Sequence, residues 1–198
     1  PSSGRLAHAT ARVSALQRGA RLIVVDPRKA GLAHKADVWL RVRPGTDAAP
    51  APAIARVMID RGWFDRGFVL RWTNAPFLIR SDTGRLLREA DLSASGDPSR
   101  FVAWDEAASR PVACDPRSAS FDSVSRSLAL FGNYTVDTQS GPLACRPVFD
   151  QVAERCRAHD AGALERITGV SATGVGRAPH ILWHSRPVRS SVARRSGG

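Results

Sequence analysis

Two short apolar runs near the start of the chain constrain its fold most strongly. The runs are RLIVV at 21–25 and DVWLRV at 37–42, and both are rich in the β-branched and aromatic residues typical of strands. Residues 26–36 between them have room for about two helical turns and come close to the minimum crossover between parallel strands, about a dozen residues. We therefore predict an α/β chain built on a parallel β-α-β unit.

Helical patterns flank this unit. Apolar residues at helical spacing occupy 6–18, before the first strand. A second helical pattern follows Asp47 and ends at Gly62. With Asp47 as the N-cap, Pro52 would remove a hydrogen bond of the helix and clash with a carbonyl, so we predict that this helix begins near Ala53.

The pattern of residues changes at about residue 76. The short runs FLIR, FVAW, PVAC, LALF and YTVD alternate with Ser, Gly, Asp and Pro, which indicates strands joined by loops. Pro147 then opens a helix, Ser171 caps another, and HILWH at 180–184 has the pattern of a final strand. On the first of these helices, the spacing predicts one apolar face made of Val148, Val152 and Cys156.

We predict four parts from these patterns. They are an α/β part of a nucleotide-binding domain at 1–75, a β-rich insertion at 76–145, a return to the α/β domain through C-terminal helices at 146–188, and an irregular basic tail at 189–198.

The charge and hydropathy of the chain exclude some classes of function. The formal net charge is +11, but six arginines follow the last acidic residue, Glu165, and supply more than half of the excess. No basic run is interleaved with aromatic residues, so we expect no specific nucleic-acid binding. No apolar run approaches the roughly 20 residues of a membrane span. We expect no transmembrane segment and a cytoplasmic location, or a periplasmic one if a targeting signal precedes Pro1.

Two carboxylates follow the two predicted strands. Asp26 lies in the turn Val25-Asp26-Pro27-Arg28 and Asp47 in the turn Pro44-Gly45-Thr46-Asp47. Ligands of parallel α/β sheets bind beyond the carboxyl ends of the strands. A carboxylate can accept two hydrogen bonds from ribose hydroxyls or from the adjacent N–H groups of guanine. The guanidinium of Arg28 can donate two hydrogen bonds to one phosphate. Gly45 allows close approach to the backbone, and a helix start after Thr46 offers free N–H groups. The alternative is that both acids only stabilise a turn and a helix start.

No other motif indicates catalysis or metal binding. Cys114, Cys145 and Cys156 are far apart and form no C-x-x-C motif, which favours three buried thiols. His180 and His184 share one face of the predicted final strand, but the sequence shows no third ligand. The residues alone therefore predict a nucleotide-binding edge, with no catalytic and no metal-ligating residues.

The segments that carry these turns resemble a known family. The stretch GARLIVVDPRKAGLAHKADVWLRVRPGTDAA, then DRGWFDRGFVLRWTN, and later ERITGVSA and HILWHSRPV are similar to the molybdopterin oxidoreductases of the dimethyl sulfoxide reductase family, which include formate dehydrogenase-like catalytic subunits. The likeness covers roughly 1–74 and 147–188, and the middle resembles the variable insertion of some members.

The resemblance implies a bis(molybdopterin guanine dinucleotide) cofactor with molybdenum or tungsten. It assigns the nucleotide part of one pterin to Val25, Asp26, Pro27 and Arg28 and to Gly45, Thr46 and Asp47. It also implies electron-transfer subunits as partners of the intact enzyme. The family's iron–sulfur segment and metal-ligating residue have no counterpart in this sequence, so the resemblance implies an internal fragment that is inactive by itself. A non-enzymatic basic binding module and a non-functional gene remnant remain as alternatives.

Overall fold

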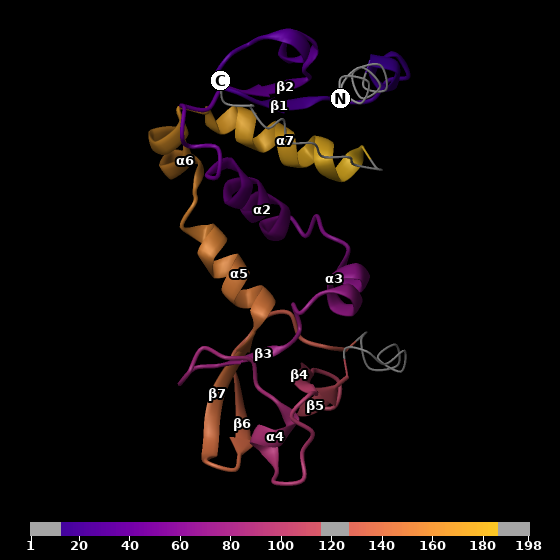
Figure 1. Cartoon of the computed structure of the whole chain (residues 1–198), viewed down its shortest axis with the longest axis vertical. Helices are drawn as coiled ribbons and strands as arrows, with labels where there is room; N and C mark the ends of the chain where they lie inside the picture. The colour runs from indigo at the N-terminus through magenta and orange to yellow at the C-terminus, as the bar shows by residue number, and fades with distance from the viewer. Residues whose placement is uncertain (1–12, 116–126, 186–198) are drawn as a thin grey trace, which may run out of the picture. The chain divides into compact units, whose positions relative to one another are not determined.

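The structure is a computed structural model that describes residues 13–115 and 127–185 (Figure 1). It divides into two compact units. The first takes in Pro1–Trp63 and Ala158–Gly198, and the second takes in Phe64–Arg157. Of the predicted helix at 6–18, residues 13–17 are helical, whereas 6–12 and the predicted basic tail at 189–198 lie outside the described residues.

The first unit contains the predicted parallel pair of strands. Strand β1 (Ile23–Val25) pairs in parallel with β2 (Val38–Leu40), with Ile23 opposite Val38 and Val25 opposite Leu40. The helical part of the crossover is a 3-10 helix, η1 (Gly31–Lys35), whose five residues make nearly two turns. It lies within the stretch for which about two helical turns were expected. The α/β class is confirmed by this arrangement.

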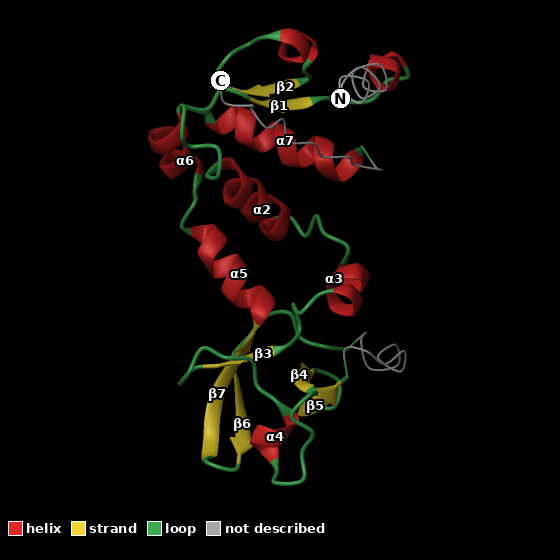
Figure 2. Ribbon diagram, viewed as in Figure 1, coloured by secondary structure: helices red, strands yellow, loops and turns green. Residues whose placement is uncertain are grey.

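Three helices complete the first unit. They are α2 (Pro50–Asp60), α6 (Ala161–Thr168) and α7 (Ala172–His184). Helix α7 lies against β2, and α2 packs on α7 (Figure 2). Gly174 of α7 faces Leu40 so closely that an added Cβ would lie 3.1 Å from its side chain. The shared core consists of Val38, Leu40, Val42, Ala53, Leu164, Val170, Val175 and Ala178.

The start of α2 corrects the sequence prediction. The helix begins at Pro50, and Ala49 is its N-cap in place of Asp47. Pro52 is tolerated because it occupies the first turn, where an amide N–H has no intrahelical partner. The predicted end is confirmed. Gly62 has φ +64°, its N–H donates to the Ile59 carbonyl at 3.0 Å, and the Trp63 N–H donates to the Met58 carbonyl at 2.7 Å.

Residues 180–184 are helical, so the predicted final strand is wrong. They form the end of α7, which begins where the Ser171 hydroxyl accepts a hydrogen bond from the Gly174 N–H at 3.4 Å. The buried residues Val175 and Ala178 and the half-buried Ile181 recur every three residues and place one face of the helix on the core. This periodicity outweighs the local strand preference of Ile-Leu-Trp.

The second unit contains antiparallel strands and short helices. Strands β3 (Leu78–Arg80), β7 (Gly141–Pro147) and β6 (Tyr134–Thr138) form one sheet in that order, and β4 (Phe101–Asp105) pairs with β5 (Arg110–Cys114). The helices of this unit are α3 (Arg66–Trp72), α4 (Glu89–Leu92) and α5 (Val148–Arg157). The predicted strand LALF forms only an isolated bridge, between Leu128 and Asp105.

The buried face of α5 differs from the predicted one. Val152 is 44% exposed, whereas Ala153 and Cys156 are buried. Residues four apart share a face only approximately, and here the face is centred on the line from Phe149 through Ala153 to Cys156. Among the described residues, no helix is long and apolar enough to cross a membrane.

Candidate functional site

The turn after β1 is held in one shape by Asp26. The Asp26 N–H donates to the Leu40 carbonyl at 3.2 Å, which extends the strand pairing by one residue. The carboxylate atom Oδ1 then accepts a hydrogen bond from the Arg28 N–H at 2.7 Å, across Pro27. This is the turn geometry that Asp favours. It uses one carboxylate oxygen, and Arg28 is left exposed at the tip of the turn.

Trp39 and Lys29 brace the same turn, and sequence reasoning missed both. The Trp39 indole Nε1 donates to the Asp26 carbonyl at 2.9 Å, and the Lys29 ammonium lies 5.5 Å from the centre of the Trp39 ring. Burial alternates along β2, with Val38 and Leu40 buried and Trp39 only half-buried. The signal available in the sequence was the two-residue period of a strand, because this period places Trp39 on the opposite face from Val38 and Leu40.

The second turn is formed by Pro44 and Gly45. Gly45 has φ +83°, and the Thr46 N–H donates to the Arg43 carbonyl at 3.1 Å, which is the pattern of a type II turn. The Thr46 hydroxyl donates to the same carbonyl at 2.7 Å. Asp47 follows as an exposed residue, and its carboxylate has no hydrogen-bond or ion-pair partner among the described residues.

The end of α6 anchors this second turn. The Arg43 N–H donates to the Thr168 carbonyl at 2.8 Å, and the Arg43 guanidinium donates to the Arg166 carbonyl at 2.6 Å. Helix α6 stops there because Gly169 adopts a left-handed conformation, with φ +76°. The turn is therefore attached to the core of the unit at a point far away in sequence.

The start of α2 does not supply the N–H groups that we expected. Pro50 and Pro52 carry no N–H, and the Ala49 N–H already donates to the Thr46 carbonyl at 3.1 Å. Only Ala51 keeps a free amide among the first-turn positions that normally bind anions. The negative charge of a bound phosphate would have to be balanced by side chains.

The two turns lie beyond the same edge of the sheet. Both follow the carboxyl ends of β1 and β2, which are parallel neighbours (Figure 2). No hydrogen bond or ion pair recorded for the described residues joins Asp26, Arg28, Thr46 or Asp47 of one turn to those of the other. The structure thus brings the predicted residues to one edge without linking them directly.

Asp37 has a different role, at the amino ends of the strands. It accepts hydrogen bonds from the Leu22 N–H at 2.8 Å and from the Arg21 guanidinium at 2.6 Å. The Leu22 N–H and then the Arg21 hydrogen bond hold the pKa of this carboxyl below its usual value. Asp37 therefore stabilises the start of β1.

The described part of the chain offers no metal centre. It contains no group of three or more His, Cys, Asp or Glu side chains that could hold an ion. The three cysteines are buried, and burial raises the pKa of Cys114 and of Cys145 to about 11. A thiol with such a pKa stays protonated near neutral pH and is a poor metal ligand. His180 and His184 lie on a helix, one turn apart, with ring centres separated by 4.3 Å.

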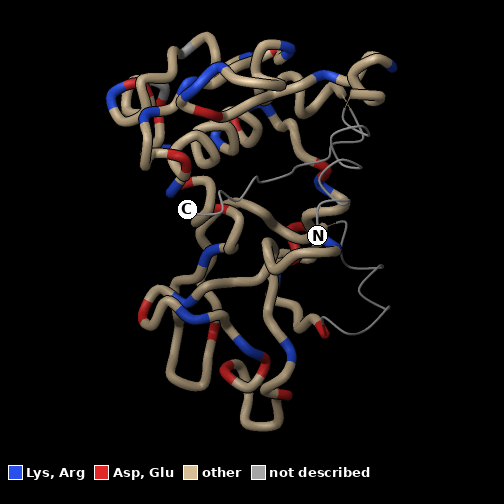
Figure 3. The backbone as a smooth tube through the Cα atoms, turned by 45° about the horizontal axis from the view of Figure 1, so that its top comes forward, with Lys and Arg blue, Asp and Glu red and all other residues tan. Residues whose placement is uncertain are grey.

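The edge beyond β1 and β2 fits a nucleotide in its donor and acceptor chemistry. It presents the second oxygen of Asp26, the unpartnered carboxylate of Asp47 and the exposed guanidinium of Arg28. Lys and Arg are otherwise interspersed with Asp and Glu along the described backbone (Figure 3). The arrangement can accept hydrogen bonds from hydroxyl or N–H groups and can neutralise an anion.

The chain is similar to parts of several known proteins. No family model matches the chain. The chain is 31% identical to a sulfite dehydrogenase subunit of Allochromatium vinosum, over 84% of this chain and 17% of that protein. It is 35% identical to the perchlorate reductase alpha subunit of Dechloromonas aromatica, over 57% and 12%. It is 31% identical to the dimethylsulfide dehydrogenase alpha subunit of Rhodovulum sulfidophilum, over 81% and 18%.

The chain spans less than a fifth of the length of each of these relatives. Two of these matches extend over four fifths or more of this chain. The chain is homologous to a segment of the catalytic subunits of the molybdopterin oxidoreductases, in the dimethyl sulfoxide reductase family.

Proposed function

We propose that the first unit forms part of a binding surface for the guanosine end of a bis(molybdopterin guanine dinucleotide) cofactor that carries molybdenum or tungsten. One observation carries the proposal. Two turns beyond the same sheet edge present carboxylate oxygens that no described residue uses, in a chain homologous to part of the molybdopterin oxidoreductase catalytic subunits. Ligand sites of parallel α/β sheets lie at such edges.

Each residue has a distinct role in this proposal. Asp26 Oδ2 and the Asp47 carboxylate accept hydrogen bonds from the ribose hydroxyls and from the adjacent N–H groups of guanine. Arg28 balances the charge of the pyrophosphate. Gly45 lets the ligand approach the backbone, while Val25, Pro27 and Thr46 hold the two turns in shape. Because α2 begins with two prolines, we assign the anion to side chains and not to the helix start.

The contribution of this chain to catalysis is binding alone. The bound metal would supply transfer of oxygen atoms or of electrons, and electron-transfer subunits would accept the electrons in the complete enzyme. The described residues contain no group of three or more His, Cys, Asp or Glu side chains that could hold a metal ion by themselves. We propose that the chain by itself has no turnover. Reduction or oxidation of a substrate by the purified chain would contradict this.

Nucleotide titrations of the purified chain test the proposed surface. We expect guanosine diphosphate to bind, and Asp26→Asn and Asp47→Asn each to weaken it about tenfold, because each substitution removes a charge-assisted acceptor. Asp137→Asn is the matched control, since Asp137 is an exposed carboxylate of β6 in the second unit. Equal losses in all three variants would rule out a specific site.

A second nucleotide assigns the two acids. Inosine diphosphate lacks the exocyclic amino group of guanine but keeps the ribose and both phosphates. The carboxylate that binds the base makes the chain prefer guanosine diphosphate, so its Asn variant loses that preference. The Asn variant at the ribose-binding acid weakens the binding of both nucleotides equally. If neither variant alters the preference, the base is not bound by these two residues.

A further inference from the structure

One peptide of the turn after β1 is held by a single side chain. The carbonyl of Asp26 accepts a hydrogen bond from the Trp39 indole Nε1 at 2.9 Å. Pro27 carries no N–H, so this carbonyl is the only group of the Asp26–Pro27 peptide that can form a hydrogen bond. Trp39 is its only recorded partner within the described part of the chain. The orientation of this peptide therefore depends on Trp39.

The strand register brings Trp39 to this carbonyl. Trp39 lies opposite Val24 in the parallel pair, so the two side chains share one face of the sheet. Val38 and Leu40 face the core from the other side of β2, which leaves Trp39 half-buried. The turn at Asp26 begins two residues beyond Val24, and the long indole reaches it along the same face. An indole that is partly buried needs an acceptor for its N–H, and the Asp26 carbonyl is that acceptor.

Asp26 is tied on both sides of its Cα atom. Its N–H donates to the Leu40 carbonyl at 3.2 Å, and its carbonyl accepts from Trp39. The first bond fixes the peptide before Asp26, and the second fixes the peptide after it. The Arg28 N–H is thereby placed to donate to Asp26 Oδ1 at 2.7 Å. These bonds together determine where the second carboxylate oxygen, Oδ2, lies.

Lys29 makes a further contact between the turn and the indole. Its ammonium lies 5.5 Å from the centre of the Trp39 ring, within the range of a cation–π contact. Lys29 follows directly after Arg28, so the turn itself helps to hold the ring that supports it. Trp39 is therefore linked to the turn both through its N–H and through its ring face.

We propose that Trp39 is a positioning residue, which fixes the direction of Asp26 Oδ2 through the Asp26 carbonyl. Its role in nucleotide binding rests on the proposed function, in which Oδ2 accepts hydrogen bonds from the ribose or from guanine. An acceptor with a fixed direction binds a ligand more tightly than a mobile one, because less conformational freedom is lost on binding. Trp39 acts on the ligand only through Asp26.

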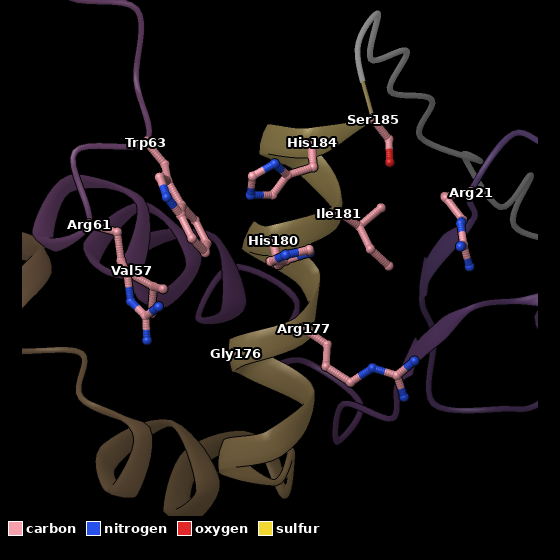
Figure 4. Close-up of a pocket in the computed structure, with 10 residues that line it drawn as sticks. All are labelled: Arg21, Val57, Arg61, Trp63, Gly176, Arg177, His180, Ile181, His184 and Ser185. Carbon is pink, nitrogen blue, oxygen red and sulfur yellow. The ribbon is translucent and has the colours of Figure 1, made fainter.

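A pocket of about 600 Å³ near the ends of α2 and α7 offers no comparable arrangement (Figure 4). Its wall carries the guanidinium groups of Arg21, Arg61 and Arg177. Figure 4 shows Arg61 on one side of α7 and the other two on the opposite side, so these donors do not converge on one ligand. At the Asp26 turn, by contrast, each contact that directs the carboxylate is a hydrogen bond with a defined partner.

Amide hydrogen exchange of the full chain, followed by nuclear magnetic resonance, tests the positioning without any ligand. Trp39→Phe keeps an aromatic ring on the sheet but removes the indole N–H. We expect the Arg28 N–H to exchange at least about threefold faster in this variant, because its bond to Asp26 Oδ1 is no longer held in place. The Thr46 N–H, bonded to the Arg43 carbonyl in the other turn, is the internal control and should exchange as before. An unchanged rate at Arg28 would overturn the proposal.

Titration with guanosine diphosphate tests whether Trp39 acts through Asp26. We expect Trp39→Phe to weaken binding about threefold, both in the unsubstituted chain and in the Asp47→Asn variant. In the Asp26→Asn variant it should have no further effect, because the acceptor is already lost. Trp104→Phe is the matched control, since Trp104 is a half-buried tryptophan of β4 in the second unit, and it should leave binding unchanged. Equal weakening by Trp39→Phe with and without Asp26 would mean a general effect on the fold and would overturn the proposal.

These measurements separate the role of Trp39 from the proposed function. If the unsubstituted chain does not bind guanosine diphosphate, the proposed function fails, and the exchange rate at Arg28 alone decides whether Trp39 fixes Asp26. If Trp39→Phe does not fold, exchange of the Trp39 indole N–H in the unsubstituted chain decides the question. This N–H should exchange more slowly than that of Trp72, which is 67% exposed. Equal rates for the two indoles would show that the bond to Asp26 is not formed and would overturn the proposal.

Discussion

The guanidinium of Arg43 donates a 2.6 Å hydrogen bond to the carbonyl of Arg166, a residue 123 positions away in the sequence. This contact joins the turn after β2 to the last turn of α6. It satisfies a carbonyl that the end of the helix would otherwise leave unpaired. The geometry of the proposed nucleotide surface therefore depends on a segment near the other end of the chain.

Removing this contact should loosen the turn. We expect Arg43→Met to lower the free energy of unfolding by about 1–2 kcal/mol, because a charge-assisted hydrogen bond is lost while the aliphatic stem is kept. Arg41→Met is the control, since Arg41 is exposed and lies two residues away. Urea denaturation followed by circular dichroism measures both. Equal stability of the two variants would show that the Arg43 contact adds nothing.

Thr168 should be sensitive to loss of its hydroxyl. The residue is fully buried, its hydroxyl donates to the Leu164 carbonyl at 2.7 Å, and it accepts from the Val170 N–H at 3.1 Å. Thr168→Val keeps the shape but leaves a buried N–H without a partner, which costs about 1–3 kcal/mol. Thr135→Val, on the exposed face of β6, should change stability by less than about 0.5 kcal/mol. The same denaturation experiment compares them.

Substitution of two glycines by alanine should change the stability of the chain in opposite directions. Gly45 has φ +83°, so Gly45→Ala strains the turn and is expected to destabilise the chain by about 1 kcal/mol. Gly176 lies inside α7 with a normal helical backbone and nothing within 4 Å of an added Cβ. Gly176→Ala should therefore stabilise by about 0.5–1 kcal/mol. Thermal unfolding of the two variants tests the difference in sign.

Alkaline pH should weaken the fold through the buried thiols. The pKa of Cys114 and of Cys145 is about 11 in the folded chain, against an ordinary value of 9.0 for both thiols, because burial disfavours the thiolate. The protonated thiols are tolerated below pH 9, and their contribution to stability is lost as the pH rises from 9 through 11. The free energy of unfolding should fall over that range.

The variant Cys114→Ala/Cys145→Ala separates the thiols from other groups, such as Tyr134, whose pKa burial also raises. We expect urea denaturation at several pH values to give a flatter pH profile for this variant than for the unsubstituted chain. Identical slopes would assign the loss of stability to groups other than the two thiols.

Local sequence patterns predicted much of the first unit. The two β-branched runs formed the parallel pair, and Gly62 ended α2, because these features depend on neighbouring residues and on backbone sterics. The end of α7 was mispredicted as a strand because Ile-Leu-Trp favours a strand locally, whereas burial of Val175 and Ala178 against β2 decides the outcome.

The candidate site was predictable as a set of residues but not as a set of contacts. Two acidic turns after two strands can be read from the sequence. The bond from Arg43 to α6 and the brace from Trp39 to Asp26 join residues distant in sequence, and no local pattern encodes such pairs. The sequence also did not predict that Ala49, and not Asp47, is the N-cap of α2. Both prolines fit the first helical turn once the helix starts at Pro50.

The parallel pair of β1 and β2 also has a consequence for association. Within the described residues, each of these strands has a partner on one side only, and Val25 is 42% exposed. The other side of each strand presents unpaired backbone donors and acceptors, which can template the addition of another strand. We therefore expect copies of the chain to associate edge to edge in concentrated solution. A polypeptide segment that adds a strand at this edge would protect the sheet from such aggregation.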